Sequence, residues 1–164
     1  MFTLSRSVRR TVLTAHIVVS VGLLGDSAGL LAIAVQAATT DDPALSRASH
    51  DTMALLSGAF GIPLSVLSIL TGVVLGLGSK WGVFRYPWVT AKLALVVSVM
   101  VVGALLIGPS EGDEAQEGLI VAGAAYDVVA LTLATGLSVF RPGGRRRPYP
   151  RRDGTARSVH PARP

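Results

Sequence analysis

The chain has 164 residues, half of them apolar, and its mean hydropathy of +0.55 is high for a water-soluble domain of this size. It contains no cysteine, which excludes disulfides, thiolate catalysis and cysteine-based metal sites. The net charge of +5 comes largely from a basic segment after Phe140, so it does not indicate a nucleic-acid-binding surface, and we expect no nucleic-acid partner.

Four long apolar segments follow one another along the chain, separated by short connections rich in charge, proline or glycine. They comprise residues 11–38, 52–77, 88–108 and 118–140. A helix rises about 1.5 Å per residue and the hydrocarbon core of a bilayer is about 30 Å thick, so each segment is long enough to cross a membrane. The sequence therefore predicts an all-α integral membrane protein, an up-down four-helix bundle whose neighbours in sequence run antiparallel.

The first segment has a second interpretation. Its basic start, its apolar run and the small residues around Ala37 resemble a secretory signal peptide with a cleavage site. The apolar part of a signal peptide usually has about 7–15 residues, whereas this run is nearly twice as long and contains Asp26. We therefore expect residues 11–38 to remain in the protein as a membrane-spanning helix.

Basic residues are distributed unevenly between the two ends of the expected bundle. Fourteen of the fifteen lysines and arginines lie in residues 1–10, 79–92 and 141–164, whereas the other two connections hold seven acidic residues and a single basic one, Arg47. Basic connections of multi-pass proteins remain in the cytoplasm. We expect a protein of the cell (inner or plasma) membrane with both termini in the cytoplasm.

Residues 141–164 are rich in arginine and proline and contain almost no aliphatic side chains. Because such a segment cannot bury a core, we expect a disordered tail. Its arginines follow a membrane-spanning helix, where each basic residue gains about 1 kcal/mol against anionic lipid headgroups. The alternative is that these arginines only hold this end of the chain on the cytoplasmic side.

Four ionisable residues fall inside the apolar segments: His16, Asp26, Lys92 and Asp127. Each costs about 2.5–3.5 kcal/mol on insertion scales, which makes them candidate functional residues. His16 and Lys92 lie near the cytoplasmic ends of their helices, where Lys92 can reach the headgroups. Asp26 and Asp127 lie near the middle, and we expect both to face the bundle interior as uncharged acids. The alternative is that each acid only bonds a neighbouring backbone carbonyl.

Small residues recur at three- and four-residue spacing and predict where the helices touch, because in lipid the closest helix contacts are made by small side chains. Pro63 should kink or loosen the second helix. The small residues are Gly22, Gly25, Gly29 and Ala32 in the first segment, Gly61, Ser65, Ser68, Gly72 and Gly76 in the second, and Gly123, Ala124, Ala130 and Ala134 in the fourth.

His50 and Met53 are three residues apart near the outer end of the second segment, and they are weak candidates for a soft-metal site such as copper. Two ligands without a third do not define a site. A haem between two histidines of one chain is excluded, because His50 lies across the membrane from His16 and His160 lies in the tail. We expect no cofactor.

Three features carry a resemblance to a known family: His16 early in the first segment, the pattern W-G-x-F-R at residues 81–85, and Lys92 inside the third segment. Together with the four-helix layout of residues 8–140, they resemble small bacterial integral membrane proteins of unknown function, distantly similar to the membrane domain of copper-resistance proteins. This chain has Leu23 where the family often has tryptophan. The resemblance implies the same topology and adds little about function.

Three classes of function remain open. The first is an accessory or structural membrane protein that binds a second copy or another membrane protein in the bilayer. The second is an ion or proton transport element that uses Asp26 and Asp127. The third, a membrane enzyme or metal handler, is least favoured, because the sequence has no nucleophile–base pair, phosphate-binding loop or H-E-x-x-H motif.

Overall fold

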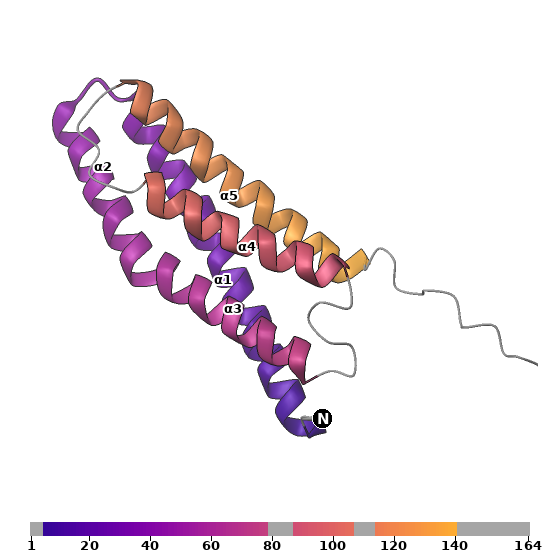
Figure 1. Cartoon of the computed structure of the whole chain (residues 1–164). Helices are drawn as coiled ribbons and strands as arrows, with labels where there is room; N and C mark the ends of the chain where they lie inside the picture. Colours follow the sequence, from indigo (N-terminus) through magenta and orange to yellow (C-terminus); the bar gives the residue numbers. More distant parts are fainter. Residues whose placement is uncertain (1–4, 79–86, 107–113, 141–164) are drawn as a thin grey trace, which may run out of the picture.

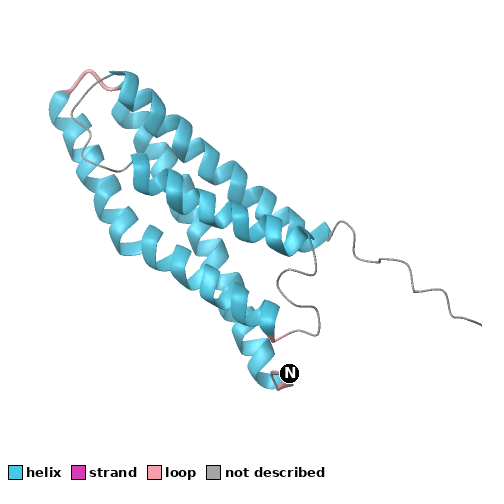
Figure 2. Cartoon of the chain, in the orientation of Figure 1, coloured by secondary structure: helices cyan, strands magenta, loops and turns pink. Residues whose placement is uncertain are grey.

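The computed structural model describes residues 5–78, 87–106 and 114–140, and within these ranges the regular structure is entirely helical (Figures 1 and 2). The predicted disordered tail and its expected contact with anionic lipid lie outside the described residues. The elements are α1 (Arg6–Thr39), α2 (Pro43–Leu56), a π-helical turn η1 (Ser57–Gly61), α3 (Ile62–Leu77), α4 (Pro87–Leu106) and α5 (Glu114–Phe140).

The helices form one four-helix bundle, which confirms the predicted fold class. Elements α2, η1 and α3 follow one another without a break as a single rod (Pro43–Leu77), so four rods are long and apolar enough to span a membrane. Helix α1 packs against α5, α3 and α2, while α4 packs mainly against α5. The start of α1, the end of α3, the start of α4 and the end of α5 lie toward the same end of the bundle (Figure 1).

Large apolar side chains cover the outside of the bundle. Val18, Leu105 and Phe140 are 65%, 76% and 83% exposed, and many other valines and leucines are similarly open. A water-soluble protein rarely exposes so much contiguous apolar surface, whereas lipid tails match it. Length, composition and this apolar exterior together define a multi-pass membrane protein that contacts the lipid bilayer.

The second rod begins at Pro43, earlier than the apolar run from Thr52 predicts. Asp42 caps its start, with the carboxylate oxygen Oδ1 accepting a hydrogen bond from the Ala44 backbone N–H at 2.8 Å, and Pro43 follows at the first helical position. The added turns carry Arg47 and Asp51, so a search for apolar residues cannot find them. This part of α2 extends the rod beyond its apolar run.

Pro63 lies just after the irregular turn in this rod. Proline has no backbone N–H and cannot donate the bond that the preceding turn of an α-helix needs. The five-residue π-helix η1 ends at Gly61, two residues before Pro63. The backbone N–H of Ile62, which follows η1, donates a hydrogen bond to the Ser57 carbonyl. The loosened turn that we expected at Pro63 therefore takes the form of a π-helix, a feature often found at functional sites.

The interior contains two apolar clusters at different heights. One is built around Leu23 and Leu131, with Val96, Val99 and Ala130, and the other around Met53 and Ile120, with Ala34 and Ala37. Ser27 lies between the two clusters along α1, and Asp127 lies between them along α5. A polar layer therefore separates two apolar layers near the middle of the bundle.

The small residues of α3 and α5 lie at helix contacts as predicted, but those of α1 do not all do so. Ser65, Ser68, Ala130 and Ala134 are at most 5% exposed. On α1, by contrast, an added Cβ at Gly25 or Gly29 would meet no atom within 4 Å, whereas one at Gly22 would meet Leu64 at 3.5 Å. The prediction that Gly25, Gly29 and Ala32 mark a contact within the bundle is wrong, because α1 turns Leu23, Ser27 and Ala34 inward instead.

Candidate functional site

Asp127 is the middle residue of α5 and lines a partly open cavity of about 40 Å³, to which four helices contribute residues. A buried water needs a cavity of about 10–15 Å³ on this measure, so the cavity has room for more than one. The lining is apolar except for the Asp127 carboxyl and the Ser27 hydroxyl. Its residues are Ser27 and Leu30 of α1, Met53 of α2, Val102 and Gly103 of α4, and Ile120, Gly123, Ala124 and Asp127 of α5.

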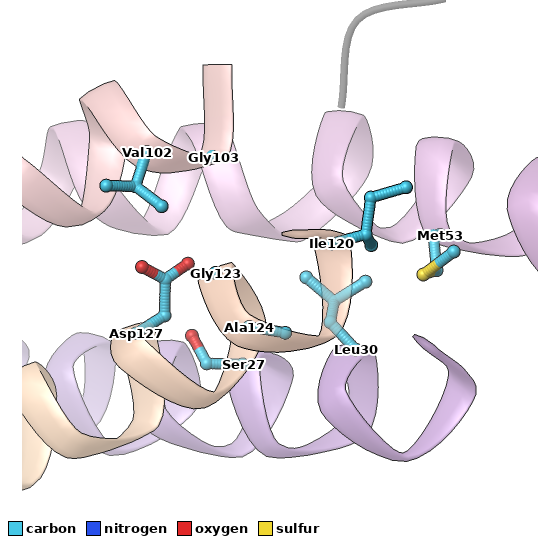
Figure 3. A pocket seen from close by; sticks show the side chains of 9 residues that line it. All are labelled: Ser27, Leu30, Met53, Val102, Gly103, Ile120, Gly123, Ala124 and Asp127. Atoms are coloured by element: carbon cyan, nitrogen blue, oxygen red, sulfur yellow. The ribbon is translucent and has the colours of Figure 1, made fainter. Parts of the chain in front are cut away.

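The Asp127 side chain points from α5 toward Val102 and Gly103 of α4, with the Ser27 side chain nearby and Met53 and Ile120 at the other end of the cavity (Figure 3). Its oxygen Oδ1 is buried and has no hydrogen-bond partner among the described residues. A buried carboxyl oxygen without a partner is rare in folded proteins and costs free energy. This side chain is therefore held in an unfavourable setting that packing alone does not explain.

Asp26 occupies a different contact, between α1 and the π-helical turn. A Cβ built on Gly61 would lie 3.1 Å from Asp26 Oδ2 and 3.5 Å from Ser57 Oγ, so the carboxyl rests directly over the turn that precedes Pro63. Oδ2 is buried and, within the described part of the chain, also lacks a hydrogen-bond partner. Glycine at position 61 is what leaves room for the carboxyl.

The two acids point to different neighbours. Asp26 faces Gly61 of the second rod, whereas the next residue of α1, Ser27, faces the cavity of Asp127. Successive residues of a helix are rotated by about 100°, which accounts for this division. Both carboxyls have a buried oxygen, but the structure gives each its own site.

His16 joins α1 to α3 nearer the N-terminal end of the bundle. Its ring nitrogen Nδ1 lies 2.8 Å from Thr71 Oγ1, and the Thr71 hydroxyl in turn donates to the Leu67 carbonyl at 2.7 Å. A Cβ on Gly72 would lie 3.3 Å from the His16 ring, so this glycine gives the imidazole its place. His16 is therefore a bonded interior residue and not a side chain reaching for the headgroups.

Lys92 connects α4 to α5 at the same end. Its ammonium nitrogen Nζ donates a hydrogen bond to Ser138 Oγ at 2.5 Å, and Ser138 donates to the Ala134 carbonyl at 3.0 Å. His16 and Lys92 therefore lie toward the same end of the bundle, each bonded to a different neighbouring helix, α3 for His16 and α5 for Lys92.

The weak metal candidates His50 and Met53 are used differently. His50 Nδ1 lies 2.9 Å from the Ser46 carbonyl oxygen of its own helix. Met53 packs in the apolar cluster with Ile120, Ala34 and Ala37, and it also lines one end of the cavity. Across residues 5–78, 87–106 and 114–140, no three histidine, aspartate or glutamate side chains gather into a set that could hold a metal ion.

Several polar residues share these sites, and sequence reasoning did not single out Thr71, Ser20 or Ser98 among them. Ser27 lines the cavity, Thr71 bonds His16, Ser20 lies 3.4 Å from Ser68 between their Oγ atoms, and Ser98 Oγ lies 2.6 Å from the Tyr126 hydroxyl. Single serines and threonines are common in apolar helices, so composition does not single them out.

Comparison of the chain with protein families, with curated proteins and with solved structures gave no match. The class of protein therefore rests on the four candidate membrane-spanning rods. Of the features that carry the family resemblance, residues 81–85 lie outside the described residues, and the resemblance stays a prediction.

Proposed function

We propose that this chain is a proton-handling membrane protein in which Asp127 takes up and releases a proton in the middle of the bilayer. The observation that carries the proposal is the Asp127 carboxyl, which lines a cavity between two apolar layers and has a buried oxygen without a protein partner. An acid in such a place is costly, and an acid retained inside a membrane is by default a functional candidate.

The cavity favours a proton over a metal ion. Ca²⁺ takes six to eight oxygen ligands and Mg²⁺ about six, whereas the cavity offers one carboxyl and one hydroxyl, from Asp127 and Ser27. A proton needs one carboxyl oxygen and a polar group or water that accepts it on release. The room available suits one or two waters beside Asp127.

The proposal includes an orientation in the cell membrane with both termini in the cytoplasm. It is supported by the concentration of lysine and arginine in residues 1–10, 79–92 and 141–164. A reporter enzyme that is active only outside the cytoplasm, fused after Arg163, should remain inactive, and the same reporter inserted after Asp41 should be active. The reverse pattern would overturn the orientation.

Proton flux into liposomes tests the function. Purified protein is reconstituted with a pH-sensitive dye inside, and a potassium diffusion potential drives protons inward. Wild-type protein should acidify the interior faster than empty liposomes, Asp127→Asn should fall to the empty level, and Asp51→Asn, which changes an exposed acid on α2, should behave as wild type. Equal flux in Asp127→Asn and wild type would exclude Asp127 as the proton carrier.

A second candidate function, an accessory protein that binds another copy of itself in the bilayer, is favoured by the outward face of α1. Gly25 and Gly29 have open space above them and Ala32 is exposed beside them. Small residues in this spacing allow two helices to approach closely in lipid. Among the described residues nothing packs on Gly25 or Gly29, so this face is open to a second α1.

Counting subunits in liposomes by single-molecule photobleaching tests this candidate. Gly29→Ile should convert wild-type dimers to monomers, and the matched variant Gly118→Ile, which alters another open glycine on α5, should not. A monomeric wild-type protein, or dimers that persist in Gly29→Ile, would contradict the accessory role of this face.

A further inference from the structure

A file of polar side chains runs along the contact between α1 and α3, from the N-terminal end of the bundle to its middle. We call it the α1–α3 seam. It consists of His16, Ser20 and Asp26 of α1 with Ser65, Ser68 and Thr71 of α3.

Close contacts join the two helices at three heights of the seam. His16 Nδ1 lies 2.8 Å from Thr71 Oγ1, Ser20 Oγ lies 3.4 Å from Ser68 Oγ, and Asp26 Oδ2 lies against Gly61. At about 1.5 Å per residue, Asp26 is about 15 Å further along α1 than His16, which is half the thickness of the hydrocarbon core.

Ser65 fills the interval between the second and third contacts. It is 4% exposed, and it shares one face of the second rod with Gly61, Ser68 and Gly72, since these positions are three or four residues apart. Gly61 and Gly72 both face α1 side chains, so this face is turned toward α1. The seam thus has a buried hydroxyl within about one turn of each neighbouring polar group.

The groups of the seam are chemically suited to pass protons. A hydroxyl is both donor and acceptor, and a neutral imidazole carries one donor and one acceptor nitrogen. A proton arriving at the solution side of His16 releases the Nδ1 proton to the Thr71 hydroxyl. That hydroxyl donates to the Leu67 carbonyl in this structure, so it must turn toward the next group before it passes its own proton on. The last transfer, to the Asp26 carboxylate, must cross a gap, because Asp26 Oδ2 has no hydrogen-bond partner among the described residues. No electrons move and no bond to carbon changes.

Beyond Asp26, α1 contributes Ile33, Ala34 and Ala37 to the apolar cluster around Met53 and Ile120. The Ser57 hydroxyl lies at the same contact as Asp26 and Gly61. Between His16 and Asp26, the apolar side chains Leu23 and Leu64 pack next to the seam. Proton movement along this stretch therefore depends on the polar side chains of the seam. Lys92, the charged residue of α4 at this end of the bundle, is bonded to Ser138 of α5.

We propose that the α1–α3 seam is the route by which Asp26 exchanges its proton with the solution at the N-terminal end of the bundle. This proposal extends the proposed function, since it assigns the second intramembrane acid its own access path. Its test is nevertheless independent of whether protons cross the membrane.

Infrared spectroscopy of the reconstituted protein provides the test. At a pH low enough to protonate the acids, the C=O band of the Asp26 acid is identified as the band lost in Asp26→Asn. Its shift on transfer to D₂O buffer then reports proton exchange at Asp26. In the double variant Ser68→Ala/Thr71→Val this exchange should slow about tenfold, equivalent to a barrier higher by about 1.4 kcal/mol.

The control is Thr132→Val, because Thr132 makes the same hydroxyl-to-carbonyl bond within its helix, to Val128 at 2.7 Å, but is exposed on α5. The rate of proton exchange at Asp26 in Thr132→Val should equal that in the wild-type protein. Unchanged exchange in the double variant, or equal slowing in the double variant and in Thr132→Val, would overturn the seam. If exchange at Asp26 slows in the double variant but liposomes show no proton flux, the seam is supported and proton transport is refuted. The two proposals can therefore fail separately.

Discussion

Asp26 and Gly61 face each other so closely that a Cβ on Gly61 would lie 3.1 Å from the carboxyl oxygen Oδ2 of Asp26. The glycine belongs to the π-helical turn that precedes Pro63, so the irregular turn and the intramembrane acid form one local structure. An acid in the middle of a membrane-spanning helix is here accommodated by the neighbouring rod, which gives it room without giving Oδ2 a hydrogen bond.

Gly61→Ala should destabilise the protein. Alanine favours a helix by about 0.5–1 kcal/mol over glycine, but forcing a methyl group into a packed contact costs about 1–3 kcal/mol, so the net effect should be a loss of about 1 kcal/mol. Gly136→Ala is the matched control, because a Cβ there meets nothing within 4 Å. Unfolding in mixed detergent measures both, and equal stability of the two variants would refute the close contact at Asp26.

His16 and Thr71 should be energetically coupled. Hydrogen bonds between membrane helices contribute about 0.6 kcal/mol on average and up to about 1.7 kcal/mol. A double-mutant cycle with His16→Phe, Thr71→Val and the combined variant should therefore give a coupling free energy of about 0.5–1.5 kcal/mol. Strictly additive effects would mean that the 2.8 Å contact between His16 Nδ1 and Thr71 Oγ1 does not stabilise the bundle.

Filling the cavity should impair proton flux more than stability. Ala124 lines the cavity beside Asp127, so Ala124→Val occupies part of the space that waters would use. We expect reduced flux and a stability change below about 1.5 kcal/mol, since a small apolar addition into a void is tolerated. Ala122→Val places the same added atoms on the exposed side of α5 and should leave the flux at the wild-type rate. A wild-type flux in Ala124→Val would argue against a hydrated Asp127.

Deletion of the residues after Pro142 should leave membrane insertion and helix content unchanged. The deleted segment has almost no aliphatic side chains with which to add to the core. Circular dichroism and a membrane-extraction assay measure the two properties. Failure of insertion would show that the arginines of the tail are needed to establish the topology, whereas weaker binding to anionic liposomes alone would support contact with headgroups.

The helices were predictable from the sequence because crossing a bilayer requires a long apolar run. The small residues of the second rod were predictable as a contact face, because Gly61, Ser65, Ser68 and Gly72 all lie on one side of it. The same argument failed for α1, where Gly25 and Gly29 face outward. Spacing identifies a face of a helix but not which neighbour, if any, covers it.

The sites were predictable only in part. Hydropathy singles out Asp26 and Asp127, but the partners depend on the vertical alignment of one helix against another, which no local pattern specifies. This alignment puts Asp26 over Gly61, places Thr71 beside His16 and opens the cavity between Asp127 and Ser27. The early start of α2 was missed because its added turns carry Arg47 and Asp51, which the polar end of a membrane helix tolerates.

The identity of the transported ion tests the central claim most directly. Currents from wild-type protein in a planar bilayer are recorded with a pH difference between the two sides and with sodium and potassium replaced in turn by a large organic cation. The account predicts that the reversal potential follows the pH difference and is unchanged by the replacement of either metal ion. A reversal potential that follows sodium or potassium, or a conductance no greater than that of the bare bilayer, would contradict it.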